Sequence, residues 1–141
     1  MATRMDDLAK HFDPDLYLPI HGRIYRIAAP TIAEADRVRP KLWGPQADSF
    51  SPADEWDECV KILGAAYLLM VEDGVSAPFV AHAGRTALIH FCSGPQGAEL
   101  GRGHWQFAHL ADRIDVDALM AELQRQANTR AARESMEKAA S

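Results

Sequence analysis

The chain has 141 residues, of which 48% are hydrophobic and 25% charged, and its formal net charge at pH 7 is −5. This length and composition indicate one globular domain that folds without a metal or a disulfide. The acidic balance argues against nucleic acid as a partner, because phosphate binding depends on clustered Lys and Arg. The longest apolar run, Leu63 to Val71, is far shorter than the roughly 20 residues of a membrane span, so we expect no membrane partner.

Residues 1–12 are a polar lead that can form one helical turn, and Asp13-Pro14-Asp15 ends it. The lead lacks the apolar segment of a secretory signal, so we expect the protein in the cytoplasm. Two short runs with alternating apolar residues then flank His21-Gly22, which predicts a β-hairpin with Pro19 on an edge strand. An isolated hairpin is marginal in water, so this one should pack on an apolar surface.

Two helices follow the hairpin. Thr31 and Glu34 form a capping box, which predicts a helix that ends by Pro40. Ser51-Pro52 begins a second helix, which should continue to Asp73-Gly74. Along it one helical face carries the apolar residues that we expect in the core: Trp56, Val60, Leu63, Tyr67 and Met70.

The second half of the chain is less clearly patterned. Thr86 to Cys92 is an apolar run that we interpret as a core helix, with a buried strand as the alternative. Gly97 to Trp105 should be weakly helical at best, because it contains three glycines. A last helix should begin at a cap on Asp115 or Asp117 and fray or become disordered beyond Ala127, where few apolar residues remain.

Together these elements predict an α+β fold that is mainly α. An N-terminal β-hairpin packs on a small helical bundle in a single domain over residues 1–112, and residues 113–141 form a partly flexible C-terminal helix. Cys59 and Cys92 have no CxxC spacing, so we interpret both as buried apolar residues in a reducing compartment.

No pattern in the chain indicates catalysis, a cofactor or a metal, so we expect a protein that is not an enzyme. The glycines between Gly94 and Gly103 are followed by no Walker lysine, and there is no GxSxG motif. No zinc-binding spacing such as HExxH links the six histidines, His11, His21, His82, His90, His104 and His109.

Binding to another protein is the better-supported expectation. Large amphipathic side chains are enriched at interface hot spots. The candidates outside the expected helix core are Tyr17, Tyr25, Trp43 and Trp105. For the two tryptophans, packing beneath loops is the alternative.

Two blocks of the chain carry a resemblance to a known family. Asp13 to Ile27 reads DPDLYLPIHGRIYRI and resembles the opening hairpin of tail assembly chaperones from long-tailed phages of actinobacteria. LGAAY at 63–67, DGV at 73–75 and AGRTA at 83–87 are similar to the central block of that family. The resemblance spans about residues 6–107, and none of its motifs is a catalytic signature.

The resemblance implies a chaperone that covers the largely helical tape measure protein in the host cytoplasm and is absent from the mature virion. It implies no catalytic residue and no cofactor. In many such phages a ribosomal frameshift appends a second domain to some copies, and the polar C-terminal segment would suit such a junction. An apolar groove between helices could hold a client helix, and the hairpin from Tyr17 to Tyr25 would contact the client or other copies of the chain.

Two other functions stay open on the sequence. One is a structural phage component, such as a head–tail connector or tail terminator. The other is a small regulator with a helix-turn-helix around Ser76 to Phe91, although the apolar run Ala87 to Phe91 leaves its recognition helix without a basic face.

Overall fold

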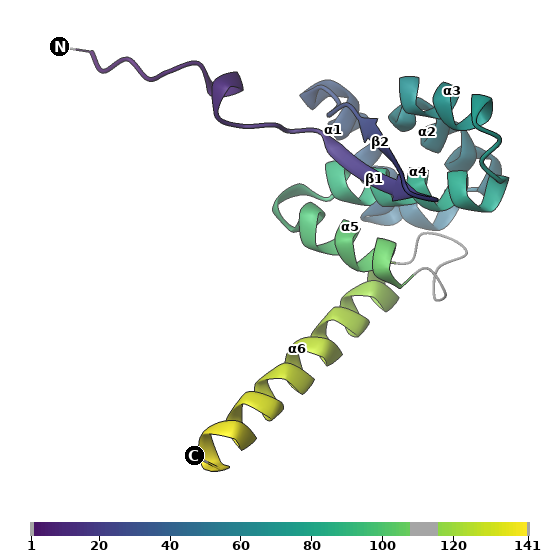
Figure 1. The fold of residues 1–141 in the computed structure, drawn as a ribbon. Coiled ribbons are helices and arrows are strands. Elements are labelled where there is room, and N and C mark those ends of the chain that lie inside the picture. The colour runs from purple at the N-terminus through teal and green to yellow at the C-terminus, as the bar shows by residue number, and fades with distance from the viewer. Residues whose placement is uncertain (1, 108–115, 141) are drawn as a thin grey trace.

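A two-stranded hairpin lies across a group of short helices, and one long helix projects from that group (Figure 1). The computed structural model describes residues 2–107 and 116–140. This architecture confirms the predicted α+β, mainly α fold. In chain order the elements are η1 (Leu8–Lys10), β1 (Leu16–Ile20), β2 (Arg23–Ile27), α1 (Ile32–Leu42), η2 (Pro45–Ser49), α2 (Pro52–Leu63), α3 (Ala65–Glu72), α4 (Ala77–Cys92), η3 (Gly94–Gln96), α5 (Gly97–Gln106) and α6 (Val116–Ala140).

The hairpin forms where the sequence predicts it. β1 and β2 are antiparallel, and Pro19 lies opposite Ile24 on a strand that is an edge of this two-stranded sheet. The turn residues His21 and Gly22 have φ values of 51° and 81°. Positive φ at both central positions matches the right-handed twist of the strands, as in type I′ turns. The side chains that face the helices are buried: Leu18, Ile20, Tyr25 and Ile27.

Both predicted helix caps are present. The Thr31 hydroxyl accepts a hydrogen bond from the Glu34 backbone N–H at 3.3 Å, and the Ser51 hydroxyl accepts one from the Asp54 N–H at 3.1 Å. However, α1 continues past Pro40 to Leu42, which corrects the expected end of that helix. Leu42 is buried, and this packing holds the last turn although Pro40 has no N–H to donate.

The predicted second helix is two helices, because the chain breaks at Gly64. This residue has φ 54° and ψ −125°, a conformation that suits glycine. The break changes which side chains reach the core. Of the predicted face only Leu63 and Met70 are buried, while Trp56 is 37% exposed. The expectation that Trp56 lies in the core is therefore wrong.

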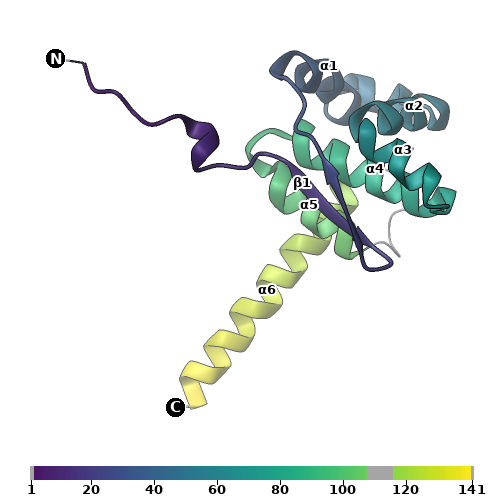
Figure 2. The same cartoon turned by 45° about the horizontal axis from the view of Figure 1, so that its top comes forward.

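Helix α4 lies at the centre of the fold, with α2 on one side and α5 on the other (Figure 2). It runs without a break through Gly84, so the predicted core helix at Thr86 to Cys92 is confirmed. Because Ser76 to Phe91 contains no turn between two helices, the helix-turn-helix motif expected within these residues is absent. Gly84 permits this packing, since a Cβ there would lie 2.4 Å from the Cβ of Cys59.

Helix α5 is regular despite its three glycines, which corrects the expectation of weak helicity. A Cβ at Gly97 would lie 2.1 Å from the His90 carbonyl oxygen, and one at Gly101 would lie 2.9 Å from the His90 Cβ. Glycine therefore lets the backbones of α5 and α4 approach closely. The packing gained by this approach offsets the poor helix propensity of these residues.

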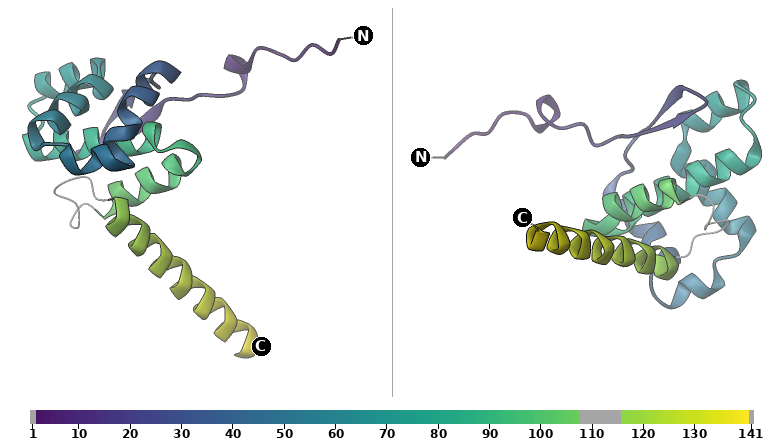
Figure 3. Two further views of the ribbon diagram at one scale, coloured as in Figure 1. Left: turned by 180° about the vertical axis from the view of Figure 1, so that it is seen from behind. Right: turned by 60° about the horizontal axis from the view of Figure 1, so that its bottom comes forward.

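Helix α6 leaves the body of the fold and projects from it (Figure 3). Its first turns pack on α5, where Leu119 is buried and Leu123 half-buried. Beyond Ala127 the helix continues to Ala140, and its side chains up to Ala139 are exposed. The expected fraying of this stretch stays a prediction. Asp115, one of the two expected caps, and the expected domain boundary at 112–113 lie outside the described residues.

Cys59 and Cys92 are free and buried, as predicted. Burial raises the pKa of the Cys59 thiol to about 12 and that of Cys92 to about 11, so neither forms a thiolate near neutral pH. None of the helices among the described residues is long and apolar enough to cross a membrane.

Candidate protein-binding surface

The outer face of the hairpin carries the first predicted contact residue, Tyr17. This side chain is 46% exposed, and Ile24 on the same outer face is 64% exposed. The Tyr17 hydroxyl donates a hydrogen bond to the Asp13 carboxylate, which raises the pKa of Tyr17 and lowers that of Asp13. The Arg26 guanidinium lies 5.9 Å from the centre of the Tyr17 ring. Tyr17 is thus accessible and also holds the start of β1 in place.

Tyr25 lies on the opposite face and is only 2% exposed. The expectation that this ring contacts a partner directly is therefore wrong. Side chains alternate between the two faces of a strand, and Tyr25 shares the inner face with its opposite residue Leu18. Its hydroxyl donates to Asp73 Oδ2 at 2.6 Å, and Arg23 Nη1 donates to Oδ1 at 2.7 Å. Tyr25 joins the hairpin to the end of α3.

The two predicted tryptophans are half-buried at junctions between helices. The Trp43 indole donates from Nε1 to the Ser93 hydroxyl at 3.2 Å and so connects the end of α1 to the end of α4. The Trp105 ring stacks on His82 with 5.4 Å between centroids. These placements match the packing alternative for both residues. The structure does not bring Tyr17, Tyr25, Trp43 and Trp105 together as one surface.

Two histidines form a buried pair between α4 and α5. The rings of His82 and His104 stack with 4.3 Å between centroids. The Thr86 hydroxyl donates to the His82 carbonyl, so it can only accept from His104 Nδ1, 2.8 Å away. His104 Nε2 is then a buried acceptor without a hydrogen-bond partner among the described residues. Burial lowers the pKa of His104 to about 3 and also lowers that of His82, which keeps the pair uncharged.

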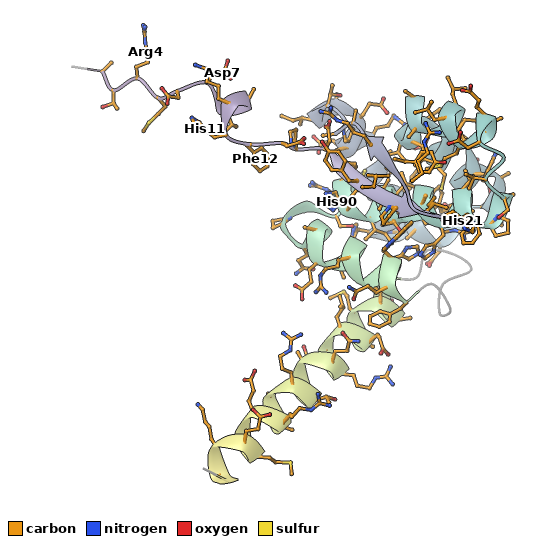
Figure 4. The ribbon with its side chains drawn as sticks, in the orientation of Figure 1. Arg4, Asp7, His11, Phe12, His21 and His90 are labelled. Carbon is orange, nitrogen blue, oxygen red and sulfur yellow. The ribbon has the colours of Figure 1, made fainter. Side chains whose placement is uncertain are left out.

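Histidines elsewhere do not join this pair. Figure 4 shows His11, His21 and His90 apart from one another. Among residues 2–107 and 116–140, no group of three or more His, Cys, Asp or Glu side chains is placed to hold a metal ion. His109 lies outside the described residues.

An accessible apolar area lies around α3, which we call the α3 surface. Every residue of this eight-residue helix except Glu72 is apolar, but only Ala66 and Met70 are buried. At 100° per residue, Tyr67, Val71 and Leu68 follow one another around the outer side. The members of the α3 surface are Trp56 (37% exposed), Tyr67 (half-buried), Leu68 (67%), Leu69 (40%) and Val71 (57%).

Helix α2 extends this surface. The Trp56 ring meets the Tyr67 ring edge to face, with 6.2 Å between centroids. Contiguous exposed apolar side chains are a marker of protein contact sites. The sequence analysis missed this surface, because it took Trp56 and Tyr67 as core residues. One feature of the sequence indicates such a surface. The run Leu63 to Val71 is too uniformly apolar for a helix that buries only one side.

A separate cleft opens between the end of β2, α1, α2 and the start of α3. Its volume is about 420 Å³, and its apolar lining includes Ala28, Pro30, Val38, Ile62 and Ala65. This is the kind of groove between elements that the sequence analysis expected, but α3 contributes only its first residues to it.

Charged groups surround the apolar lining of this cleft. Arg26, Arg37 and Lys61 lie along it, and Glu58 is buried beside them at 2% exposure. Glu58 Oε2 lies 2.8 Å from Arg37 Nη1 and 3.5 Å from Lys41 Nζ. Burial alone raises the pKa of Glu58, but Arg37 and the two lysines outweigh it, so the pKa is lowered. Arg37 also pairs with Glu34, which lines the cleft, and Arg26 pairs with Asp15. The cleft therefore presents an apolar floor with a border of paired charges.

Comparison with known proteins places most of the chain in one family. Residues 6–140 match the family described as "Domain of unknown function (DUF7426)". No curated protein and no solved structure matches the chain.

Proposed function

The chain belongs to the DUF7426 family, and we propose that it acts as a phage tail assembly chaperone. In this proposal it binds the tape measure protein in the host cytoplasm during tail morphogenesis and is absent from the mature virion. The resemblance of residues 6–107 to such chaperones supports the proposal. The function needs no catalysis and no cofactor, only a surface that covers apolar parts of a client reversibly.

The observation that carries the proposal is the α3 surface. A largely helical client that is free in solution exposes apolar stripes at i, i+3, i+4 and i+7, which invite aggregation. The exposed sides of Leu68 and Val71 offer an apolar area to such a stripe, with Trp56 at its border. Removing such apolar area from water is the main favourable term in most protein association, and a tryptophan such as Trp56 is a frequent hot spot.

The α3 surface is also held rigidly, which favours binding. Ala66 and Met70 anchor the inner side of α3 in the core, and Asp73 at its end receives hydrogen bonds from Arg23 and Tyr25. A surface that is already ordered loses little conformational entropy when a partner arrives. Several copies along one extended client would add their weak contacts through multivalency.

The test is co-expression with the tape measure protein encoded by the same phage. The native chain should co-purify with the tape measure protein and keep it soluble. A variant with Leu68→Asp and Val71→Asp should lose both effects, because each substitution places a charge in the contact area. Ile32→Asp is the matched control, since Ile32 is 82% exposed but lies at the start of α1, away from the α3 surface.

Three outcomes would contradict the proposal. The native chain could fail to bind the tape measure protein, or the double variant could hold it as well as the native chain does. The protein could also be found in purified virions, in which case a structural component such as a connector or tail terminator becomes the better explanation.

A further inference from the structure

The negative charge of the chain is concentrated in the two helices that carry the α3 surface. Residues 52–73, from the start of α2 to the C-cap of α3, contain six acidic side chains and one lysine. The rest of the chain contains fourteen acidic and fourteen basic side chains, so the formal net charge of −5 belongs to this segment. The two helices lie together at the side of the body away from α6 (Figure 1). A region with this excess of one sign attracts partners of the opposite sign.

Three of the six carboxylates are paired with cations inside the chain. The pairs are Glu55 with Arg85, Asp73 with Arg23, and Glu58 with Arg37, Lys41 and Lys61. The cluster around Glu58 lies on the side of α2 that lines the cleft, and Trp56 does not line that cleft. Lys61, the one lysine of the segment, belongs to this cluster, because its Nζ lies 3.5 Å from Glu58 Oε1. These cations therefore do not neutralise the border of the α3 surface.

The other three carboxylates are exposed and form no ion pair with another described residue: Asp54, Asp57 and Glu72. Glu72 lies four positions after Leu68, so these two side chains are neighbours on the exposed side of α3. Asp57 follows Trp56 directly on α2, and Asp54 lies one turn earlier. The apolar α3 surface is thus bordered by unpaired carboxylates on α2 and at the end of α3.

We propose that the partner of the α3 surface is an amphipathic helix that carries Lys or Arg residues beside its apolar stripe. This inference rests on the proposed function, because it takes the α3 surface as the site that receives a helix of the client. The apolar stripe would meet Leu68 and Val71, and the cations beside it would face Asp57 and Glu72. Exposed charge pairs each add little affinity, but they speed association and disfavour partners with acidic borders. The carboxylates would therefore select the basic helical stretches of a long client.

The test uses the full chain and two synthetic helical peptides that share one stripe of leucines at i, i+3, i+4 and i+7. One peptide carries lysines beside the stripe, and the other carries glutamates at the same positions. Fluorescence anisotropy measures the dissociation constant of each peptide. At low salt the lysine peptide should bind about tenfold more tightly than the glutamate peptide. This difference should shrink in about 1 M salt, where exposed charges are screened within roughly 3 Å.

Two double variants separate the border carboxylates from the net charge of the chain. Asp57→Asn with Glu72→Gln should reduce the preference for the lysine peptide to less than about threefold, because the facing charges are gone. Asp36→Asn with Asp48→Asn is the matched control. It removes the same charge at exposed positions outside α2 and α3, and it should keep the preference of the native chain.

A third double variant, Leu68→Ser with Val71→Ser, leaves the charge unchanged and removes the apolar contact. It should weaken the binding of both peptides. A lysine peptide that binds this variant as tightly as the native chain is held by net charge alone, which would overturn the inference. Equal affinity of the native chain for both peptides, or an unchanged preference after Asp57→Asn with Glu72→Gln, would overturn it as well.

Co-expression with the tape measure protein distinguishes the failure of this inference from the failure of the proposed function. A chain that keeps the tape measure protein soluble but binds the two peptides equally, or binds neither, retains the proposed function and loses the preference for a basic helix. A chain that binds neither peptide and does not hold the tape measure protein would contradict both proposals.

Discussion

Helix α3 is the more apolar, with seven apolar residues of eight against ten of sixteen in α4, yet α4 is the enclosed helix. The hairpin, α2 and α5 enclose α4, and Leu88 and Ile89 have no measurable exposure. α3 lies at the border of the fold, and only Ala66 and Met70 are buried. A helix that is apolar on all sides is normally fully enclosed. The difference teaches that apolar side chains make a helix suitable for burial, whereas its position determines how much of it is free for a partner.

The largest effect should come from the enclosed helix. Leu88→Ala should lower the free energy of unfolding by about 2–5 kcal/mol, because it removes buried methyl groups and leaves a cavity in close-packed surroundings. Chemical denaturation followed by circular dichroism measures this change. A loss below about 1 kcal/mol would show that α4 is not enclosed as described.

Close packing of α4 against α2 gives the second prediction. Gly84→Ala should lower the free energy of unfolding by about 1–3 kcal/mol, although alanine is the better helix former, because its Cβ would overlap Cys59. The double variant Gly84→Ala with Cys59→Gly lacks the overlapping side chain. It should therefore lose less stability than the sum of the two single losses. Strictly additive losses in the double variant would contradict this explanation.

The contact between α4 and α5 should make stability depend on pH. The folded pKa of His104 is about 3, below its unfolded value of about 6.5, so the unfolded chain binds the extra proton. The free energy of unfolding should therefore fall as the pH drops from about 6.5 towards 3, by up to about 1.4 kcal/mol for each pH unit. In the His104→Gln variant the free energy of unfolding, measured by denaturation at several pH values in this range, should depend less steeply on pH. An unchanged slope would show that His104 does not control it.

The smallest effect should come from the exposed helix. Leu68→Ala should change the free energy of unfolding by no more than about 0.5 kcal/mol, because this side chain is 67% exposed. Denaturation of this variant beside Leu88→Ala compares the same substitution in both helices. A loss of more than about 1 kcal/mol would mean that Leu68 is packed in the folded protein, which would weaken the case for the α3 surface.

Local signals predicted much of the fold. Thr31 and Ser51 cap their helices as expected, and the hairpin has its turn at His21-Gly22. These features depend on residues within three or four positions of one another, so sequence patterns suffice to find them. Tyr17 also lies on an accessible surface, in agreement with its expected role, but that role itself stays a prediction.

Other features depend on neighbours that are distant in the sequence. The face that α2 turns to the core carries Cys59 and Leu63 and leaves Trp56 outside it, and the chain breaks at Gly64 before α3 begins. Tyr25 is buried because the register of the hairpin puts it on the inner face, beside Asp73 of a later segment. No short pattern contains this information, so the cleft could not be identified beforehand, and the only signal for the α3 surface was the uniformly apolar run Leu63 to Val71.

The sequence by itself determined the class of the fold, its capped helices, its hairpin and its buried cysteines. These follow from local hydrogen bonding and from the repeat of apolar residues along a single element. Only the tertiary structure decided that the glycines of α5 are packing sites, that α3 exposes Leu68 and Val71, and which residues line the cleft. The physical reason is that the burial of a side chain depends on how separate elements pack against one another, and this packing exists only in the folded protein.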